Sequence, residues 1–248
     1  MNNEDFSSIY NNQDYATKHE GWHFEDTEAK IKDISLFSNA LVSRIKKDDI
    51  TIADIGTGMG GVLNGFVKQV TKHSGKQVEG IAFEISEFAV SKGKQMFPEL
   101  KWNNRELLET DGPYDVVMFI DVLEHLENPW QLLRMTAKIS RYMLIRQPLL
   151  DNYSNYRTDN YKSHRDTWGH IAFFNYRSFI DMAIATGWNK CDVKLVAPWE
   201  LNTGEKKIPV PFWKTMLSKY YREHISYFVS GFYLNGLFES KDFSGKHF

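Results

Sequence analysis

Residues 51–61 read Thr-Ile-Ala-Asp-Ile-Gly-Thr-Gly-Met-Gly-Gly, and this stretch decides the fold. Apolar residues lead to Asp54, and four glycines then follow within six residues. The pattern predicts a buried strand that turns sharply into a helix, because glycine tolerates positive φ and places no side chain between backbone and ligand. The first turn of that helix would present unpaired N–H groups and the positive end of its dipole. The stretch is therefore typical of a loop that binds a nucleotide cofactor.

The acid at position 54 narrows the choice of cofactor. Gly56, Gly58 and Gly61 also match the G-x-G-x-x-G spacing of dinucleotide binding, so an NAD-dependent oxidoreductase is one alternative. A carboxylate two residues before the first glycine disfavours a pyrophosphate and suits a ligand with a positive group, such as an ammonium or a sulfonium. The stretch resembles motif I, D-x-G-x-G-x-G, of the class I S-adenosylmethionine-dependent methyltransferases, and every fixed position matches.

Two further segments extend this resemblance. Residues 77–84 read as a second strand that ends in Glu84, where an acid can accept hydrogen bonds from both ribose hydroxyls. Residues 114–121 read as a further strand, and its continuous apolar run (116–120) is typical of a parallel strand buried on both faces. The run leads into Asp121-Val-Leu-Glu-His-Leu-Glu-Asn-Pro129, which is similar to the D-x-L-E-H-L-x-x-P pattern of the same superfamily. The resemblance covers about residues 50–150.

Strand and helix patterns alternate along the chain, which predicts a parallel sheet with helices on both faces. The resemblance implies one α/β domain over residues 1–248: a Rossmann-like, doubly wound sheet of about seven strands, mostly parallel, with an antiparallel last strand. The expected parts are an N-terminal lid and helix (1–47), a cofactor-binding core (48–147), a substrate loop (148–175) and a C-terminal completion of the sheet (176–248) with an aromatic insertion (198–225). Expected helices are 27–47, 60–72, 86–96, 129–139 and 176–187; expected strands are 50–55, 77–84, 100–102, 115–121, 141–147, 191–197 and 226–238.

The resemblance places S-adenosylmethionine at the carboxyl ends of these strands. Asn104 departs from the family, which commonly has an acid there to meet the adenine amino group. The N-terminal aromatic segment is expected to fold over the cofactor as a lid. The residues expected to bind the cofactor are Asp54, Gly56, Thr57, Gly58, Gly60, Glu84, Ile85, Asn104, Asp121, Tyr15 and His23.

Three histidines are candidates for the chemistry. His164 and His170 could act as a general base near neutral pH. The Asp121-x-x-Glu124-His125 spacing, with His170 further on, looks like the E-x-x-E-H metal site of ubiquinone-biosynthesis and small-RNA methyltransferases. Here the first position is aspartate, which has a shorter reach, and L-E-H-L also occurs in members of the superfamily without a metal. We therefore expect no metal, and a base, substrate-orienting or structural role for His125.

The segment after the fifth strand is long, polar, aromatic and locally basic, and long loops in compact domains are usually functional or disordered. Its cations suit an acceptor with sugar, phosphate or carboxylate groups, because arginine binds the last two in a bidentate manner. A solvated surface loop is the alternative. The expected substrate-binding residues are Arg146, Tyr156, Arg157, Tyr161 and Arg165.

Composition limits the other classes of function. The net charge of −2 gives no basic face for nucleic acid, and no apolar run is long enough for a membrane span. The single cysteine, Cys191, and the absence of a signal peptide pattern favour the cytoplasm. We expect methyl transfer to an oxygen of a small molecule, such as a surface-polysaccharide precursor. A non-catalytic cofactor-binding partner subunit is a further alternative. A homodimer is compatible with the aromatic residues in 198–237.

Overall fold

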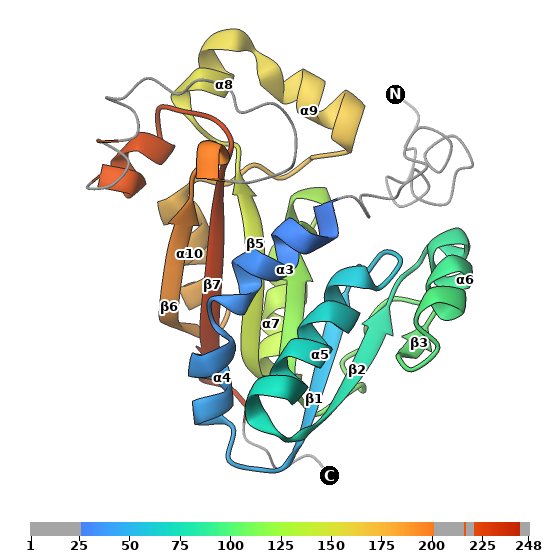
Figure 1. Ribbon diagram of the computed structural model, residues 1–248. Helices are drawn as coiled ribbons and strands as arrows, with labels where there is room; N and C mark the ends of the chain where they lie inside the picture. Colours follow the sequence, from blue (N-terminus) through green and yellow to red (C-terminus); the bar gives the residue numbers. More distant parts are fainter. Residues whose placement is uncertain (1–25, 201–215, 217–220, 244–248) are drawn as a thin grey trace.

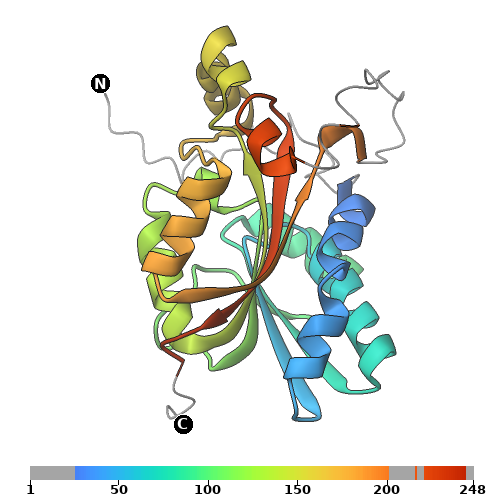
Figure 2. The same ribbon diagram turned by 90° about the vertical axis from the view of Figure 1, so that its left-hand side faces the viewer.

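The computed structural model describes residues 26–200, 216 and 221–243. Seven strands form one sheet in the order β3-β2-β1-β4-β5-β7-β6, flanked by helices (Figures 1 and 2). The strands are β1 (Asp49–Ile55), β2 (Gln77–Phe83), β3 (Lys101–Asn103), β4 (Tyr114–Ile120), β5 (Ser140–Leu149), β6 (Trp188–Val196) and β7 (Phe232–Ser240). The helices are α3 (Thr27–Ser35), α4 (Ser38–Arg44), α5 (Gly61–Ser74), α6 (Glu87–Met96), α7 (Pro129–Ile139), α8 (Tyr153–Thr158), α9 (Asn160–Trp168) and α10 (Tyr176–Ala185), with the 3-10 turns η2 (Leu123–His125) and η3 (Pro198–Glu200).

The sheet topology confirms the predicted fold class. β1 pairs in parallel with β2 and β4, while β3 and β5 extend the parallel part outward. β7 lies antiparallel to both β5 and β6. The order of the strands reverses between β1 and β4, because the chain winds outward from β1 in one direction and from β4 in the other. Ligands bind at such a reversal, outside the carboxyl ends of the strands.

The apolar run in β4 is continuous because both faces of the sheet are covered. Val116, Met118 and Ile120 pack in a core with α3, α4 and α5, whereas Val117 and Phe119 belong to a second core with α7 and α10. Figure 2 shows these two helical layers on opposite sides of the sheet. Successive side chains in a strand point to opposite faces, so a strand between two layers needs an apolar residue at every position.

Three elements differ from the predicted ones by more than two residues at a boundary. The helix predicted over 27–47 divides into α3 and α4, and the Ser38 hydroxyl donates a hydrogen bond to the Ser35 carbonyl at the break. Strand β6 begins at Trp188, directly after Gly187, whose φ of +103° ends the preceding helical segment. Strand β7 begins at Phe232 rather than 226, because residues 221–226 are helical.

The predicted substrate loop contains the two short helices α8 and α9. The Asn152 side chain accepts a hydrogen bond from the Asn155 N–H and so caps α8. Asp159 separates the helices with a φ of +52°, and Gly169 ends α9 with a φ of +74°. These caps are local signals for helices, but the irregular, polar composition of the segment led to the prediction of a loop. Figure 1 shows both helices above the carboxyl ends of the central strands.

A buried ion-pair cluster ties α3 to the sheet. Arg146 on β5 is only 4% exposed, and its Nε donates a hydrogen bond to Asp33 Oδ2 at 3.1 Å. Its Nη1 pairs with Asp121 at the end of β4, and its Cζ lies 3.7 Å from the ring centroid of Tyr233 on β7. Lys30 on α3 pairs with Asp121 at 3.2 Å. The cluster therefore joins α3, β4, β5 and β7.

We predict that Arg146→Met lowers the free energy of unfolding by about 3–5 kcal/mol, because it leaves Asp33 buried without its cation. Arg141→Met is the matched control on the same strand: Arg141 is half exposed and lies 3.8 Å from Glu239. We expect the control to lose less than about 1 kcal/mol. Urea unfolding of both variants measures the difference, and equal losses would show that the cluster does not hold α3 in place.

Candidate functional site

A cavity of about 980 Å³ opens at the carboxyl ends of β1 and β4. Gly60 and Asn104, two of the residues expected to bind the cofactor, do not line it, and Tyr15 and His23 lie outside the described residues, as does the rest of the expected lid before residue 26. The other residues that were predicted for the cofactor or the chemistry do line it: Asp54, Gly56, Thr57, Gly58, Glu84, Ile85, Asp121, His125, His164 and His170.

The glycine loop forms the first wall of the cavity. Gly56, Gly58 and Gly60 have φ values of +68°, +59° and +81°, which suit glycine far better than any residue with a Cβ. The Gly56 N–H donates to the Phe83 carbonyl at the end of β2, which fixes the loop against the neighbouring strand. A Cβ at Gly60 would lie 2.8 Å from the Trp102 ring, so Gly60 serves close packing behind the loop rather than the cavity surface.

Two buried carboxyl groups stand beside this loop. Asp54 Oδ2 accepts a hydrogen bond from the Thr57 hydroxyl at 2.8 Å, while Oδ1 is buried and has no hydrogen-bond partner among the described residues. Burial raises the pKa of Asp54 to about 7, and the nearby Glu84 adds to the rise. Glu84 accepts hydrogen bonds from the backbone N–H groups of Gly58 and Ser86, both at 2.9 Å. Burial also raises the pKa of Glu84, against the effect of these N–H groups.

Asn104 supports the first wall from behind. Its Nδ2 donates hydrogen bonds to the carbonyls of Glu84 and Ile85, at 3.0 and 3.1 Å. The amide therefore holds the backbone that carries the acid. Whether Asn104 also meets an adenine group stays a prediction.

Asp121 lies at the floor, directly after β4. Its φ of +57° is uncommon for a residue other than glycine. Burial acts to raise the pKa of Asp121, but Arg146 and Lys30 outweigh it and hold the pKa below its ordinary value, so the carboxylate is ionised. Lys30 also lines the cavity, and the sequence did not identify it because it lies on an ordinary amphipathic helix without a motif.

The second wall combines Glu124 and His125 from η2 with His170 from the segment after α9 and His164 from α9. The His125 and His170 ring centroids are 4.8 Å apart, and the His164 ring stacks on His170 at 5.7 Å. The Ile171 and Ala172 N–H groups both donate to the Glu124 carbonyl, at 2.8 and 3.0 Å, and so hold this segment against η2.

Glu124 is almost completely buried in this wall. Gln147 on β5 donates a hydrogen bond to Glu124 Oε2 at 3.1 Å. Burial and the charge of Asp121 raise the pKa of Glu124 to about 8. Burial lowers the pKa of His164, so its imidazole is neutral near pH 7 and can accept a proton.

The residues predicted for substrate binding lie mostly away from the cavity lining. Helix α9 turns His164 and Trp168, four residues apart, toward the cavity. Tyr156 is 73% exposed, Arg157 and Arg165 are also exposed, and the Tyr161 hydroxyl donates to Asp151. Arg146 lines the cavity, but its guanidinium is held by Asp33, Asp121 and Tyr233. Substrate contacts by these five residues stay predictions.

The fold and the glycine-loop cavity define a class I methyltransferase architecture, and comparison with known proteins agrees. The methyltransferase domain family matches residues 22–193, which is more than half of the chain. The chain therefore belongs to the methyltransferase domain family, and it is an S-adenosylmethionine-dependent methyltransferase, as its resemblance to class I enzymes predicted. A comparison with curated protein sequences gave no match. No helix in the described parts of the chain is long and apolar enough to cross a membrane.

Solved structures share the fold at low sequence identity. Magnesium protoporphyrin IX methyltransferase (ChlM) from Synechocystis PCC 6803, solved with S-adenosylhomocysteine, has a TM-score of 0.62 and 13% identity, over 95% of this chain and 100% of that chain. The plantazolicin methyltransferase BpumL, also with S-adenosylhomocysteine, has a TM-score of 0.63 and 13% identity, over 95% and 94%. A chain in the complex of the Haloferax volcanii Trm112 methyltransferase activator with a methyltransferase has a TM-score of 0.57 and 14% identity, over 95% and 97%. At this identity, the likeness shows the fold.

We predict that Asp54→Asn stabilises the protein more at pH 8 than at pH 5. The pKa of Asp54 is about 7 in the folded state and near 3.8 when unfolded, so the folded state binds more protons between these values. The free energy of unfolding of the wild type therefore falls as pH rises from about 4 to about 7. The Asp54→Asn variant does not lose this stability, because asparagine does not ionise. The advantage of the variant increases by roughly 2–3 kcal/mol from pH 5 to pH 8.

Urea unfolding at several pH values measures this difference. Asp49→Asn, an exposed change at the opposite end of β1, is the matched control. A difference between wild type and Asp54→Asn that does not change with pH would contradict the raised pKa.

Proposed function

We propose that this enzyme transfers the methyl group of S-adenosylmethionine to an oxygen of a small acceptor that carries sugar, phosphate or carboxylate groups, such as a surface-polysaccharide precursor. The observation that carries the proposal is the pair of unlike walls around one cavity. One wall holds the glycine loop and two buried acids, and the other holds three histidines and Glu124. The first suits a cationic nucleoside cofactor, and the second suits an acceptor with a proton to lose.

The cofactor is assigned to the glycine-loop wall. Asp54 Oδ1 has no hydrogen-bond partner among the described residues and is a suitable acceptor for the ammonium of the methionine part. Each Glu84 oxygen already accepts one backbone N–H, and a carboxylate has about four acceptor sites, so two remain for the ribose hydroxyls. We assign Gly56, Thr57, Gly58 and Ile85 to the surface against the nucleoside, and Asp121 to the floor near the sulfonium.

The acceptor is assigned to the histidine wall. A lone pair of the acceptor oxygen attacks the methyl carbon, the carbon–sulfur bond breaks, and its electrons stay on sulfur to give S-adenosylhomocysteine. The sulfonium is already a good electrophile, so the protein mainly positions the two reactants. A hydroxyl acceptor also loses a proton, which His164 or His170 accepts. An acceptor oxygen that is already an anion needs no base, and its charge suits Lys30, which lines the cavity.

We predict that S-adenosylhomocysteine binds about tenfold more tightly at pH 8 than at pH 6, because an ammonium pairs with Asp54 only when the carboxyl group, with its pKa of about 7, is ionised. Calorimetric titration measures this, with NAD as the control ligand. Asp54→Asn is expected to bind weakly and without this pH dependence. Binding of NAD alone would contradict the cofactor assignment, and a wild-type affinity that does not change with pH would contradict the contact to Asp54.

We predict that His164→Ala and His170→Ala retain their affinity for S-adenosylhomocysteine within about twofold but lose about 100-fold or more in methyl transfer to a hydroxyl acceptor. Radiolabelled S-adenosylmethionine, offered with a panel of sugars, sugar phosphates and hydroxy acids, measures the transfer. His73→Ala, an exposed change on α5, is the matched control. Full activity in both cavity variants would remove the histidine wall from the chemistry.

A further inference from the structure

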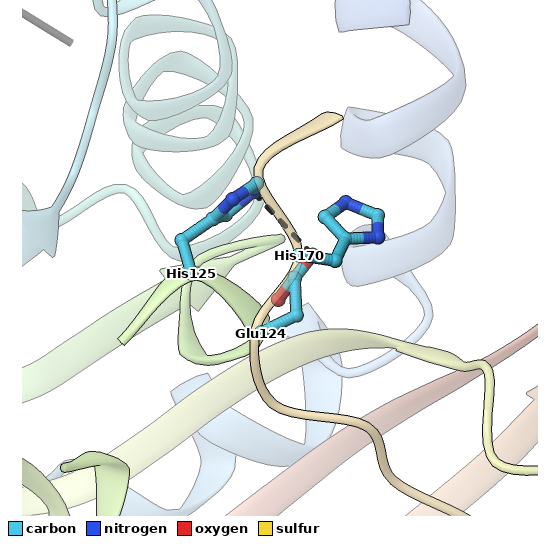
Figure 3. Close-up of side chains that lie close together, drawn as sticks. All are labelled: Glu124, His125 and His170. Carbon is cyan, nitrogen blue, oxygen red and sulfur yellow. Dashed lines mark ion pairs between the residues drawn. The ribbon is translucent and has the colours of Figure 1, made fainter. Parts of the chain in front are cut away.

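The histidine wall contains three possible metal ligands from two distant segments of the chain. One donor atom from each of Glu124, His125 and His170 lies within 4.8 Å of the other two. Figure 3 shows that the three side chains lie close together, with the ion pair between Glu124 and His125 marked. Glu124 Oε1 lies 4.0 Å from His125 Nε2. Two imidazoles and one carboxylate are a donor set that Zn²⁺ and related divalent ions prefer.

The backbone places these donors together. Glu124 and His125 lie in η2, and the Glu124 carbonyl accepts hydrogen bonds from the Ile171 and Ala172 N–H groups. The backbone next to His170 is therefore held against η2, and His170 lines the cavity. Its ring also stacks on His164, with an interplanar angle of 9°. Backbone hydrogen bonds beside His170 and the stacking of its ring on His164 therefore hold His170 in place without a bound ion.

Neighbouring groups orient two of the donors. His125 Nδ1 lies 3.3 Å from the Gly169 carbonyl; because a carbonyl only accepts, Nδ1 is the donor in this contact, and Nε2 lies on the side of Glu124. Gln147 donates to Glu124 Oε2, which leaves Oε1 to face the histidines. Oε1 is buried and accepts no hydrogen bond from the described residues. Hydrogen bonds of this kind to the far side of a ligand are a regular feature of metal sites.

Asp121 does not complete the set. Its Oδ2 already pairs with Arg146 and Lys30, so its charge is neutralised within the buried cluster. The sequence pattern places Asp121 in the first position of a four-ligand motif, and that position argued against a metal. The structure instead assembles three ligands without it. Three protein ligands and one open position are the arrangement of catalytic zinc sites.

We propose that Glu124 Oε1, an imidazole nitrogen of His125 and one of His170 bind a single divalent transition-metal ion of the zinc class, with an open position toward the cavity. Metal–ligand bonds of about 2.0–2.2 Å place tetrahedral donors about 3.3 Å apart. The present separations of up to 4.8 Å therefore have to shorten by roughly 1 Å or more. Side-chain rotation around the fixed backbone of η2 and residues 169–172 supplies a movement of this size.

The role of the ion rests on the proposed function. A hydroxyl oxygen of the acceptor occupies the open position, where the ion lowers the pKa of the hydroxyl. The proton passes to His164, which lines the same wall and is not a ligand. The oxygen then attacks the methyl carbon as described above, and the ion undergoes no change of charge.

The test is a calorimetric titration of the full-length protein with Zn²⁺ after removal of metals by a chelator, with neither cofactor nor acceptor present. We expect one site per chain, and an affinity that falls at least tenfold to 100-fold in Glu124→Gln and in His170→Ala. His73→Ala removes an exposed imidazole and is expected to bind as the wild type does. The visible absorption of bound Co²⁺ reports tetrahedral nitrogen and oxygen ligation in the wild type and is expected to be lost in the two cavity variants.

Thermal unfolding checks that the variants are folded, and Glu124→Gln preserves the shape of the side chain if His170→Ala does not fold. Absence of stoichiometric zinc binding in the folded wild type overturns the proposal. Unchanged affinity in both cavity variants, or loss of affinity in His73→Ala alone, also overturns it. The proposed function is decided separately, by S-adenosylhomocysteine binding and methyl transfer. Zinc binding without any methyl transfer would therefore support the site and contradict the role of the ion in this reaction.

Discussion

The structure depends on one buried cation, the Arg146 guanidinium. It lies where four elements meet, between Asp33 of α3 and Asp121 after β4, with the Tyr233 ring of β7 against it. The buried carboxylates of Asp33 and Asp121 both need this cation, because an unpaired charge in the interior costs several kcal/mol. Arg146 therefore acts with Lys30 to keep Asp121 ionised at the floor of the cavity, and through Asp33 it ties α3 to the sheet. Lys30, which also lies on α3, forms a second ion pair with Asp121.

Among the described residues, no lysine or arginine pairs directly with the buried acids Asp54 and Glu124, and Lys30 offsets their burial only in part. Burial raises the pKa of Asp54 to about 7 and contributes, with the charge of Asp121, to raising that of Glu124 to about 8. A group with a raised acidic pKa destabilises the fold at neutral pH, because the unfolded chain ionises it without cost. A cationic ligand lowers both pKa values and recovers that free energy on binding. In the two proposals, Asp54 meets the ammonium of the cofactor and Glu124 meets a metal ion, so each acid gains a positive charge that lowers its pKa.

Most of the fold could be predicted from the sequence, because its signals are local or periodic. The glycines after Asp54 mark the end of β1, and the unbroken apolar run of β4 shows that two helical layers cover the sheet. The site was harder to predict. The sequence identified His125 and His170, but the hydrogen bonds from residues 171 and 172 to Glu124 that bring them together join segments more than 40 residues apart. The role of Arg146 was also hidden, since a cation in a basic segment suggests a ligand contact, and only the fold shows that its partners are Asp33 and Asp121.

The short stretch from Asp121 to His125 sets the relation between the two walls. Asp121 leaves β4 with a positive φ and turns the chain into η2, so that residues three and four positions later face the opposite side of the cavity. In the proposed assignment, this one turn joins the cofactor side to the acceptor side, and it is held by Arg146 at its start and by residues 169–172 at its end. In-line displacement requires the methyl carbon and the attacking oxygen to lie within about 3–3.5 Å. An insertion in this turn would leave the residues of each wall unchanged but would move the two walls, and the reacting atoms that they hold, further apart. If the two walls hold the cofactor and the acceptor as proposed, the length of this turn constrains catalysis as much as the identity of the groups that it carries.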